Sequence, residues 1–221
     1  MPLQDNVKVY GNADIVWVLD VSGTMADITQ GVKDNIAQFV GDLTSSGQSP
    51  VKSLRLGLVT HDVEGNATVR ASNFAETTEE FVSNLMNSPE GANEYGLPAV
   101  DRALDFNWRS EARRYIIFIT DEPVAGGTDP AGQTAKLPEL SQKMAGLHVH
   151  FLGFGPACES YEQLGLTPGS DYTDCIPGPD DHGALVGLGF QTVLKGLAQT
   201  ITAAGNVEDM QANVPKNLYG L

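Results

Sequence analysis

The chain has 221 residues, of which 41% are hydrophobic and 19% are charged, as is ordinary for one folded domain with a full core. Its formal net charge is −15 and its pI is near 4.4, which argues against nucleic acid and anionic membranes as partners because both would be repelled. No apolar stretch approaches the roughly 20 residues of a membrane span. Residues 1–10 lack the apolar segment of a signal peptide, so we expect a cytoplasmic protein, or an extracellular one if a signal peptide has been removed.

Strand and helix patterns alternate along the chain. Short, continuous apolar runs predict buried strands, and longer runs with one apolar face predict helices. The expected strands cover residues 15–19, 54–59, 67–70, 115–120 and 149–154. The expected helices cover residues 31–43, 77–86, 97–106, 137–145, 161–164 and 185–203. Helices of ten or more residues between strands indicate parallel pairing, so we expect an α/β fold: a doubly wound three-layer sandwich with a mostly parallel central sheet.

Two helix starts have the pattern of a capping box, in which a hydroxyl residue is followed three positions later by Glu or Gln. Thr77 and Glu80 form the first pattern, and Ser160 and Gln163 form the second. The second lies within residues 156–183, which are rich in Gly, Pro and Asp. We therefore expect this region to be mostly loop, with one short helix.

One domain is expected over residues 1–204, followed by a tail or linker over residues 205–221, where periodicity is weak. Cys158 and Cys175 are the only cysteines, and both fall in the loop-rich region. They would be able to pair in an oxidising compartment. We favour two free thiols, because the cytosol keeps cysteines reduced.

The most informative segment follows the first expected strand. That strand ends at Asp20, and two hydroxyl residues, Ser22 and Thr24, come directly after it. Open α/β sheets bind ligands at this edge. One carboxylate and two hydroxyls are hard oxygen donors, which suit Mg²⁺, Mn²⁺ or Ca²⁺. The alternative is a polar turn in which a hydroxyl caps the next helix.

A second carboxylate is expected at the same edge. The strand at residues 115–120 ends at Asp121, and the carboxyl ends of parallel strands meet at one edge of a sheet. Asp121 should therefore lie within reach of Asp20. The loop at residues 91–96 precedes a helix and is a candidate source of a further oxygen ligand.

These segments resemble the von Willebrand factor A family over roughly residues 14–203. Residues 20–24, Asp-Val-Ser-Gly-Thr, are similar to the family's metal-site motif Asp-x-Ser-x-Ser, with Thr in place of the last Ser. Residues 119–123, Ile-Thr-Asp-Glu-Pro, resemble the strand end that carries the family's last aspartate. Residues 55–62 and 91–108 resemble a branch that includes hemicentin-like and alpha-kinase-associated A domains.

The resemblance implies a metal-ion-dependent adhesion site that binds Mg²⁺, or else Mn²⁺ or Ca²⁺. Its implied metal ligands are Asp20, Ser22, Thr24, Asp121 and Glu94. Most of the family has a Thr on the middle loop, and Glu94 is the nearest match here. Direct binding by Glu94 would add a third negative charge to the ion's ligands and make the site less electrophilic, whereas binding through water would leave two carboxylates on the ion. The expected partner contacts are Asn93, His61, Met25 and Glu122.

The function that the resemblance implies is cation-dependent protein binding without catalysis. Two carboxylates roughly neutralise a divalent ion, and Mg²⁺ leaves room in its coordination sphere for a carboxylate from a partner protein. A bound cation would also reverse the local repulsion between this acidic domain and an acidic ligand. The domain would then serve as an adaptor for a larger machine, such as an AAA+ ATPase or a kinase, or as an extracellular adhesion domain.

An enzyme is the alternative. Haloacid-dehalogenase-like phosphatases carry Asp-x-Asp-Gly-Thr after an apolar strand, and residues 20–24 differ from this motif at one position. In that chemistry the first aspartate is the nucleophile and the second protonates the leaving group. Ser22 occupies the second position and is no acid at neutral pH, so we disfavour a Mg²⁺-dependent phosphatase that uses Asp20.

Other polar residues have simpler interpretations. His148 and His150 alternate along the last expected strand, and their apolar neighbours favour packed or edge histidines over metal ligands. Asp62 is expected to accept a structural hydrogen bond in a turn. Residues 180–182, Asp-Asp-His, lie beside prolines and glycine and are expected to form an exposed turn.

Overall fold

The computed structural model describes residues 11–45, 51–61, 70–88, 95–124 and 129–174. Within these residues, six strands form one sheet in the order β3-β2-β1-β4-β5-β6. The strands are β1 (Gly11–Asp20), β2 (Val51–His61), β3 (Arg70–Ser72), β4 (Ala112–Ile119), β5 (Val149–Gly155) and β6 (Asp171–Asp174). All neighbours pair in parallel except β3, which is antiparallel to β2. The predicted doubly wound α/β fold is confirmed.

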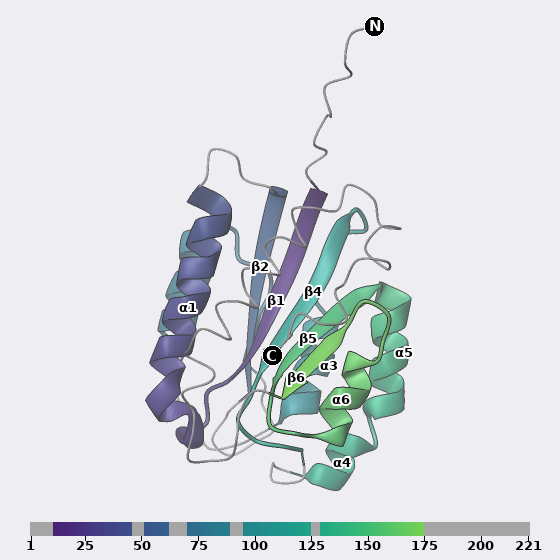
Figure 1. The fold of residues 1–221 in the computed structure, drawn as a ribbon. Coiled ribbons are helices and arrows are strands. Elements are labelled where there is room, and N and C mark those ends of the chain that lie inside the picture. The colour runs from purple at the N-terminus through teal and green to yellow at the C-terminus, as the bar shows by residue number, and fades with distance from the viewer. Residues whose placement is uncertain (1–10, 46–50, 62–69, 89–94, 125–128, 175–221) are drawn as a thin grey trace, which may run out of the picture.

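Helices cover both faces of this sheet (Figure 1). They are the 3₁₀ turn η1 (Gly23–Met25), α1 (Ala26–Ser45), α2 (Thr78–Met86), α3 (Gly96–Leu104), α4 (Pro130–Thr134), α5 (Leu137–Leu147) and α6 (Glu159–Gly165). Apolar residues of α1 and α2 pack in one core, and those of α3, α5 and α6 pack in the other. The sheet therefore forms the middle of three layers, as expected.

Strand β1 lies at the centre of the sheet and is buried on both faces. Ile15, Trp17 and Leu19 belong to the core under α1, whereas Val16 and Val18 belong to the core under α3. All five side chains are fully buried. Because both faces of β1 are buried, apolar and polar residues do not alternate along this run.

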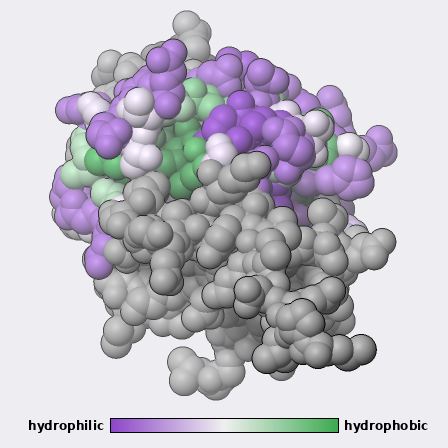
Figure 2. Space-filling view, turned by 90° about the horizontal axis from the view of Figure 1, so that it is seen from above, coloured by the Kyte–Doolittle hydropathy of each residue, from purple (hydrophilic) through white to green (hydrophobic). Residues whose placement is uncertain are grey.

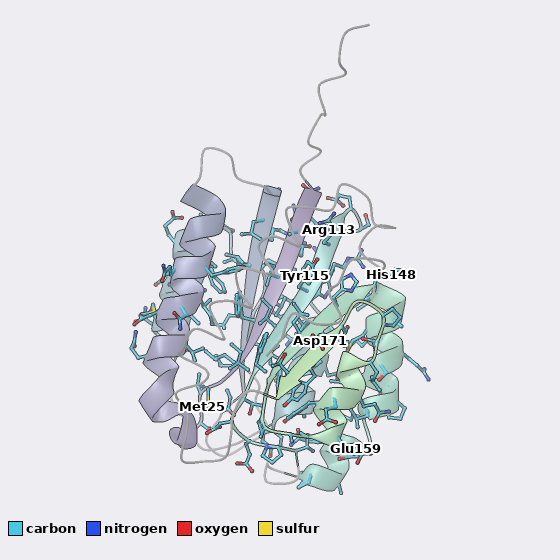
Figure 3. The ribbon with its side chains drawn as sticks, viewed as in Figure 1. Met25, Arg113, Tyr115, His148, Glu159 and Asp171 are labelled. Atoms are coloured by element: carbon cyan, nitrogen blue, oxygen red, sulfur yellow. The ribbon has the colours of Figure 1, made fainter. Side chains whose placement is uncertain are left out.

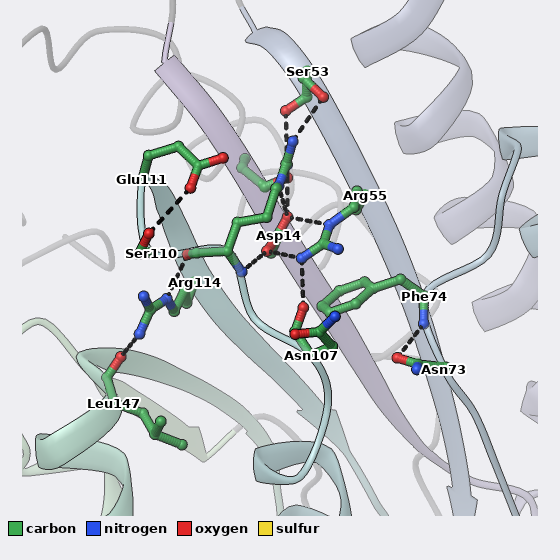
Figure 4. Close-up of polar contacts among 12 residues, drawn as sticks. Asp14, Ser53, Arg55, Asn73, Phe74, Asn107, Ser110, Glu111, Arg114 and Leu147 are labelled. Carbon is green, nitrogen blue, oxygen red and sulfur yellow. Dashed lines mark hydrogen bonds and ion pairs between the residues drawn. The ribbon is translucent and has the colours of Figure 1, made fainter.

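The polar start of β1 is held by a buried ion-pair network (Figure 4). Asp14 is fully buried, and its carboxylate pairs with Arg55 and Arg109 at 2.6 Å each. Arg55 also lies 4.2 Å from the ring centre of Phe74 and donates to the carbonyl of Asn107. Burial alone would raise the pKa of Asp14, but hydrogen bonds from the two arginines outweigh it and hold the pKa below its usual value.

Figure 2 views the molecule from above relative to Figure 1, and among the coloured residues hydrophilic side chains border a smaller apolar area. Arg113 and His148 lie toward the end of the sheet where the strands begin, and Met25 lies toward the other (Figure 3). Within the described residues, no helix is both long enough and apolar enough to cross a membrane.

Several predicted boundaries differ from the structure. Helix α1 begins at Ala26, five residues before the expected start at Gly31. The short edge strand occupies Arg70–Ser72 rather than residues 67–70, of which only Arg70 is described. Strand β6 was not predicted, because Asp171–Asp174 is short and mostly polar and takes its place in the sheet by pairing with β5.

The two predicted capping boxes have opposite outcomes. Thr77 is the N-cap of α2, and its hydroxyl accepts the backbone N–H of Glu80 at 3.1 Å, as predicted. The pattern of Ser160 and Gln163 is no cap, because α6 begins at Glu159 and its N-cap position is Cys158, whose side chain makes no capping hydrogen bond.

The predicted alternation of His148 and His150 along one strand is wrong. His148 is exposed and lies at the C-cap of α5, where its φ is 51°, so it precedes β5. His150 is packed as expected, with its ring 5.4 Å from that of Tyr115 and its Nδ1 3.3 Å from the carbonyl oxygen of Pro168.

Cys158 is a buried free thiol. The expected helix 185–203, the tail, Cys175 and the turn 180–182 lie outside the described residues.

Candidate functional site

The pairing register brings three strand ends together at one edge of the sheet. Asp20, the last residue of β1, pairs with His61, the last residue of β2. On the other side of β1, Leu19 pairs with Ile119, which ends β4. The segment that follows β4 therefore starts beside Asp20. This is the edge predicted from the sequence to hold the candidate ligands.

Asp20 is a fully buried carboxylate held by two neutral donors. Its Oδ1 accepts the backbone N–H of Ser22 at 2.8 Å, and its Oδ2 accepts the hydroxyl of Thr120 at 2.7 Å. None of the ion pairs among the described residues includes Asp20. Asp14 is buried to the same extent on the same strand, but it has two arginines. An unpaired buried charge is costly, so Asp20 is suited to an external cation.

The loop after Asp20 turns tightly back toward the core. Ser22 is 2% exposed, and its carbonyl accepts the N–H of Met25 at 3.0 Å. Thr24 lies within the 3₁₀ turn that results, η1. Met25 is fully buried among the side chains of the core under α1. The turn thus directs Met25 inward, and we leave it out of the surface that contacts a partner.

The segment after β4 adds two carboxylates near Asp20. Thr120 is followed by Asp121 and Glu122, which are both half-buried. The hydroxyl oxygen of Thr120 accepts the backbone N–H of Glu122 at 3.1 Å. Burial raises the pKa of Glu122, and the negative charges of Asp121 and Asp20 raise it further. Glu122 therefore feels the negative charges of both aspartates, and the potential at this edge of the sheet is negative.

The third predicted loop lies only partly within the described residues. Asn93 and Glu94 of this loop fall outside them, and the chain is described again from Tyr95; Asp62, which follows β2, is also outside the described residues. Tyr95 occupies the N-cap position of α3 but makes no side-chain capping bond. Instead the N–H of Leu97 donates to the side-chain oxygen of Gln133, a buried residue of α4, at 3.0 Å. Helix α4 thus caps α3 at this edge.

The available donors fit a hard divalent cation that is bound partly through hydroxyls. Among the described residues, no three side chains of His, Cys, Asp or Glu converge into a group that could hold a metal ion. A site at this edge would therefore combine Asp20 and Asp121 with the hydroxyls of Ser22 and Thr24. Carboxylate and hydroxyl oxygens are the ligand types that Mg²⁺ and Ca²⁺ prefer.

Sequence reasoning gave no role to Thr120 and Gln133. The only sequence feature that could have indicated a role for Thr120 is its hydroxyl group, because the residue directly precedes the candidate ligand Asp121. Gln133 gave no signal, because its hydrogen bond joins it to a residue 36 positions earlier in the chain.

A mostly parallel sheet between two helical layers, with oxygen donors gathered at the strand ends, defines the chain as an α/β domain with a candidate cation-binding edge. The family model of the von Willebrand factor type A domain matches residues 14–174, which is most of the chain. The protein therefore belongs to the von Willebrand factor type A domain family. Domains of this family generally mediate interactions between proteins and are typically not enzymes.

Solved structures share the fold at low sequence identity. A von Willebrand factor type A protein from Catenulispora acidiphila has a TM-score of 0.59 and 12% identity, over 87% of this chain and 43% of that one. The pilus adhesin SpaC from Lactobacillus rhamnosus GG, in an open conformation, has a TM-score of 0.56 and 14% identity, over 90% of this chain and 30% of that one. The SpRpn10 VWA domain has a TM-score of 0.54 and 14% identity, over 77% of this chain and 90% of that one.

These comparisons confirm the fold and the family. The chain spans less than half of the length of the first two structures. No curated protein matches the sequence. Nothing in the comparisons supports the alternative of a haloacid-dehalogenase-like phosphatase.

Proposed function

We propose that this domain binds one divalent cation at the carboxyl edge of its sheet and uses the cation to dock a carboxylate of a protein partner. The observation that carries the proposal is the fully buried Asp20, which has neutral donors and no positive partner among the described residues. A fold does not normally retain such a charge without compensation. A bound cation would supply that compensation.

The roles of the ligands follow from their charges. Asp20 and Asp121 would roughly neutralise a divalent ion, and Ser22 and Thr24 would add hydroxyl oxygens without further charge. When bound, Mg²⁺, or Mn²⁺ or Ca²⁺ in its place, supplies positive charge and a coordination position that an outside oxygen can occupy. Glu94 would complete the site, either directly or through water.

The residues around the ligands would meet the partner. We propose His61, Asn93 and Glu122 for this surface. Glu122 is half-buried beside two other carboxylates, so it would disfavour an acidic partner until a cation is bound. The cation would thus make recognition of an acidic partner conditional.

The formal net charge of −15 supports the same conclusion at long range. An acidic domain repels an acidic ligand, and a cation reverses that repulsion only where it is bound. The proposal covers two settings: an adaptor domain inside the cell for a larger machine, such as an AAA+ ATPase or a kinase, and an adhesion domain outside the cell. The structural similarity to a pilus adhesin is compatible with the second setting.

The test measures the proton relaxation rate of water, which increases when water exchanges onto protein-bound Mn²⁺. Metal-free protein is titrated with MnCl₂, and sodium acetate is then added as a simple carboxylate probe. We expect bound Mn²⁺ to enhance water relaxation and acetate to reduce the enhancement by displacing metal-bound water. Electron paramagnetic resonance must show that acetate releases no Mn²⁺ from the protein.

Two variants make this test specific. Asp121→Asn should lose the enhancement at the same Mn²⁺ concentration. Asp105→Asn is the matched control, because Asp105 is exposed and pairs with Lys143 at the end of α3 away from the site. Equal enhancement in the wild type and Asp121→Asn would contradict the proposed ligand set, and no enhancement in the wild type would contradict the function.

A further inference from the structure

We propose that Thr120 is the positioning residue of this cation site, an inference that rests on the proposed function. Its hydroxyl donates to Oδ2 of Asp20 at 2.7 Å and accepts the N–H of Glu122 at 3.1 Å; the carbonyl oxygen of Glu122, at 3.4 Å, is a more distant acceptor. Asp20 ends β1, whereas Glu122 lies in the turn that carries Asp121. One hydroxyl group therefore joins the two segments that supply the carboxylate ligands.

Thr120 is itself firmly held by β5. It is 1% exposed, and its N–H donates to the carbonyl of Phe154 at 3.1 Å. Its side chain and carbonyl lie against Gly155, where an added Cβ would come within 2.9 Å of the carbonyl oxygen and 3.1 Å of the Thr120 methyl group. The absence of a side chain at Gly155 lets the two segments approach this closely. The direction of the Thr120 hydroxyl is thereby restricted by packing.

The bond to Asp20 determines how that carboxylate is presented. A carboxylate has about four positions at which it can accept a hydrogen bond or bind a cation. The N–H of Ser22 and the hydroxyl of Thr120 occupy one position on each oxygen. The remaining positions are left for a cation, and rotation of the carboxylate would break one of the two bonds.

The bond to Glu122 determines how Asp121 is presented. A hydroxyl that accepts the N–H two residues later closes a tight local turn. Asp121 is the residue enclosed by this turn, so its backbone direction depends on the oxygen of Thr120. The negative charges of Asp20 and Asp121 also act unfavourably on that of Glu122. Thr120 opposes that repulsion through the bonds it makes on either side.

The test compares the Mn²⁺ affinity of variants by measuring free Mn²⁺ with electron paramagnetic resonance. Thr120→Val keeps the shape and removes the hydroxyl, and it should weaken binding about tenfold to a hundredfold, the usual cost of losing a group that orients a metal ligand. Thr120→Ser keeps the hydroxyl and should restore an affinity close to that of the wild type. Thr120→Cys, which keeps only a weak donor, should lie between them.

Thr167→Val is the matched control. The hydroxyl of Thr167 bonds to the carbonyl of Leu164 at 2.9 Å and to the hydroxyl of Ser170 at 2.6 Å. The variant therefore loses two hydrogen bonds through the same chemical change, beside β6, which is separated from β1 by two strands. We expect it to destabilise the fold while leaving the Mn²⁺ affinity unchanged.

The outcomes separate this inference from the proposed function. If the wild type binds Mn²⁺ and Thr120→Val binds it equally well, the positioning role is wrong and the function stands. Equal losses in Thr120→Val and Thr167→Val would also overturn the positioning role, because the loss would then follow general stability. If Thr120→Val does not fold, equal affinities of the wild type, Thr120→Ser and Thr120→Cys would overturn it. Absence of binding in the wild type would overturn both proposals.

Discussion

Replacing Asp14 with asparagine tests how strongly the network at the start of β1 stabilises the fold. Asp14 is fully buried and accepts hydrogen bonds from the side chains of Arg55 and Arg109 and from the backbone of Arg109. Asparagine would turn an NH₂ group toward these donors. Removing one partner of a buried ion pair costs about 3–5 kcal/mol. Because the two arginine side chains remain 26% and 19% exposed and can regain water, we expect about 3 kcal/mol.

Urea denaturation at neutral pH measures this cost. With an m-value of about 2 kcal/mol/M, the expected loss lowers the midpoint by about 1.5 M. Asp101→Asn is the control, because Asp101 forms a partly exposed pair with Lys143 at 2.8 Å, and such pairs are worth about 1 kcal/mol or less. If Asp14→Asn lowers the midpoint no more than Asp101→Asn does, the argument from burial is refuted.

Three further predictions follow from the same contacts. The folded-state pKa of Asp14 lies below its ordinary value of about 3.9, so its stabilisation is complete above that pH and is lost as pH falls through the folded-state value; melting temperatures should therefore drop more steeply below pH 4 in the wild type than in Asp14→Asn. In chelator, Asp20→Asn should cost less than about 1 kcal/mol or should stabilise, because it removes a buried charge without a positive partner; a loss as large as that of Asp14→Asn in urea would contradict this. Gln133→Leu should cost about 1–3 kcal/mol in urea, because it leaves the N–H of Leu97 unpaired, whereas Gln142→Leu on the exposed side of α5 should be nearly neutral.

The sequence predicts those parts of the fold that burial alone determines. Residues 15–19 form a continuous apolar run because β1 is covered on both faces, and this run located the central strand. Strand β6 has no such run, since it is a four-residue edge strand with an aspartate at each end. It exists because β5 offers free backbone groups for pairing, which no local pattern records.

In the candidate site, too, the sequence predicted some features and not others. Asp20 and the segment of Asp121 were placed at one edge from the ends of their strands, and the register confirms that those ends are neighbours. The burial of Met25 depends on the 3₁₀ turn after Ser22. The sequence alone does not indicate this turn, so Met25 was expected at the surface because it follows Thr24. Contacts that join distant segments, such as that of Thr120 with Asp20, require the folded structure.

Calorimetric titration of the metal-free protein with MgCl₂ at neutral pH tests the central claim most directly. The account predicts one saturable binding event per chain, which disappears in Asp20→Asn and persists in Asp14→Asn if that variant folds. Absence of saturable heat with the wild type, or an unchanged isotherm in Asp20→Asn, would contradict a cation site built on this carboxylate.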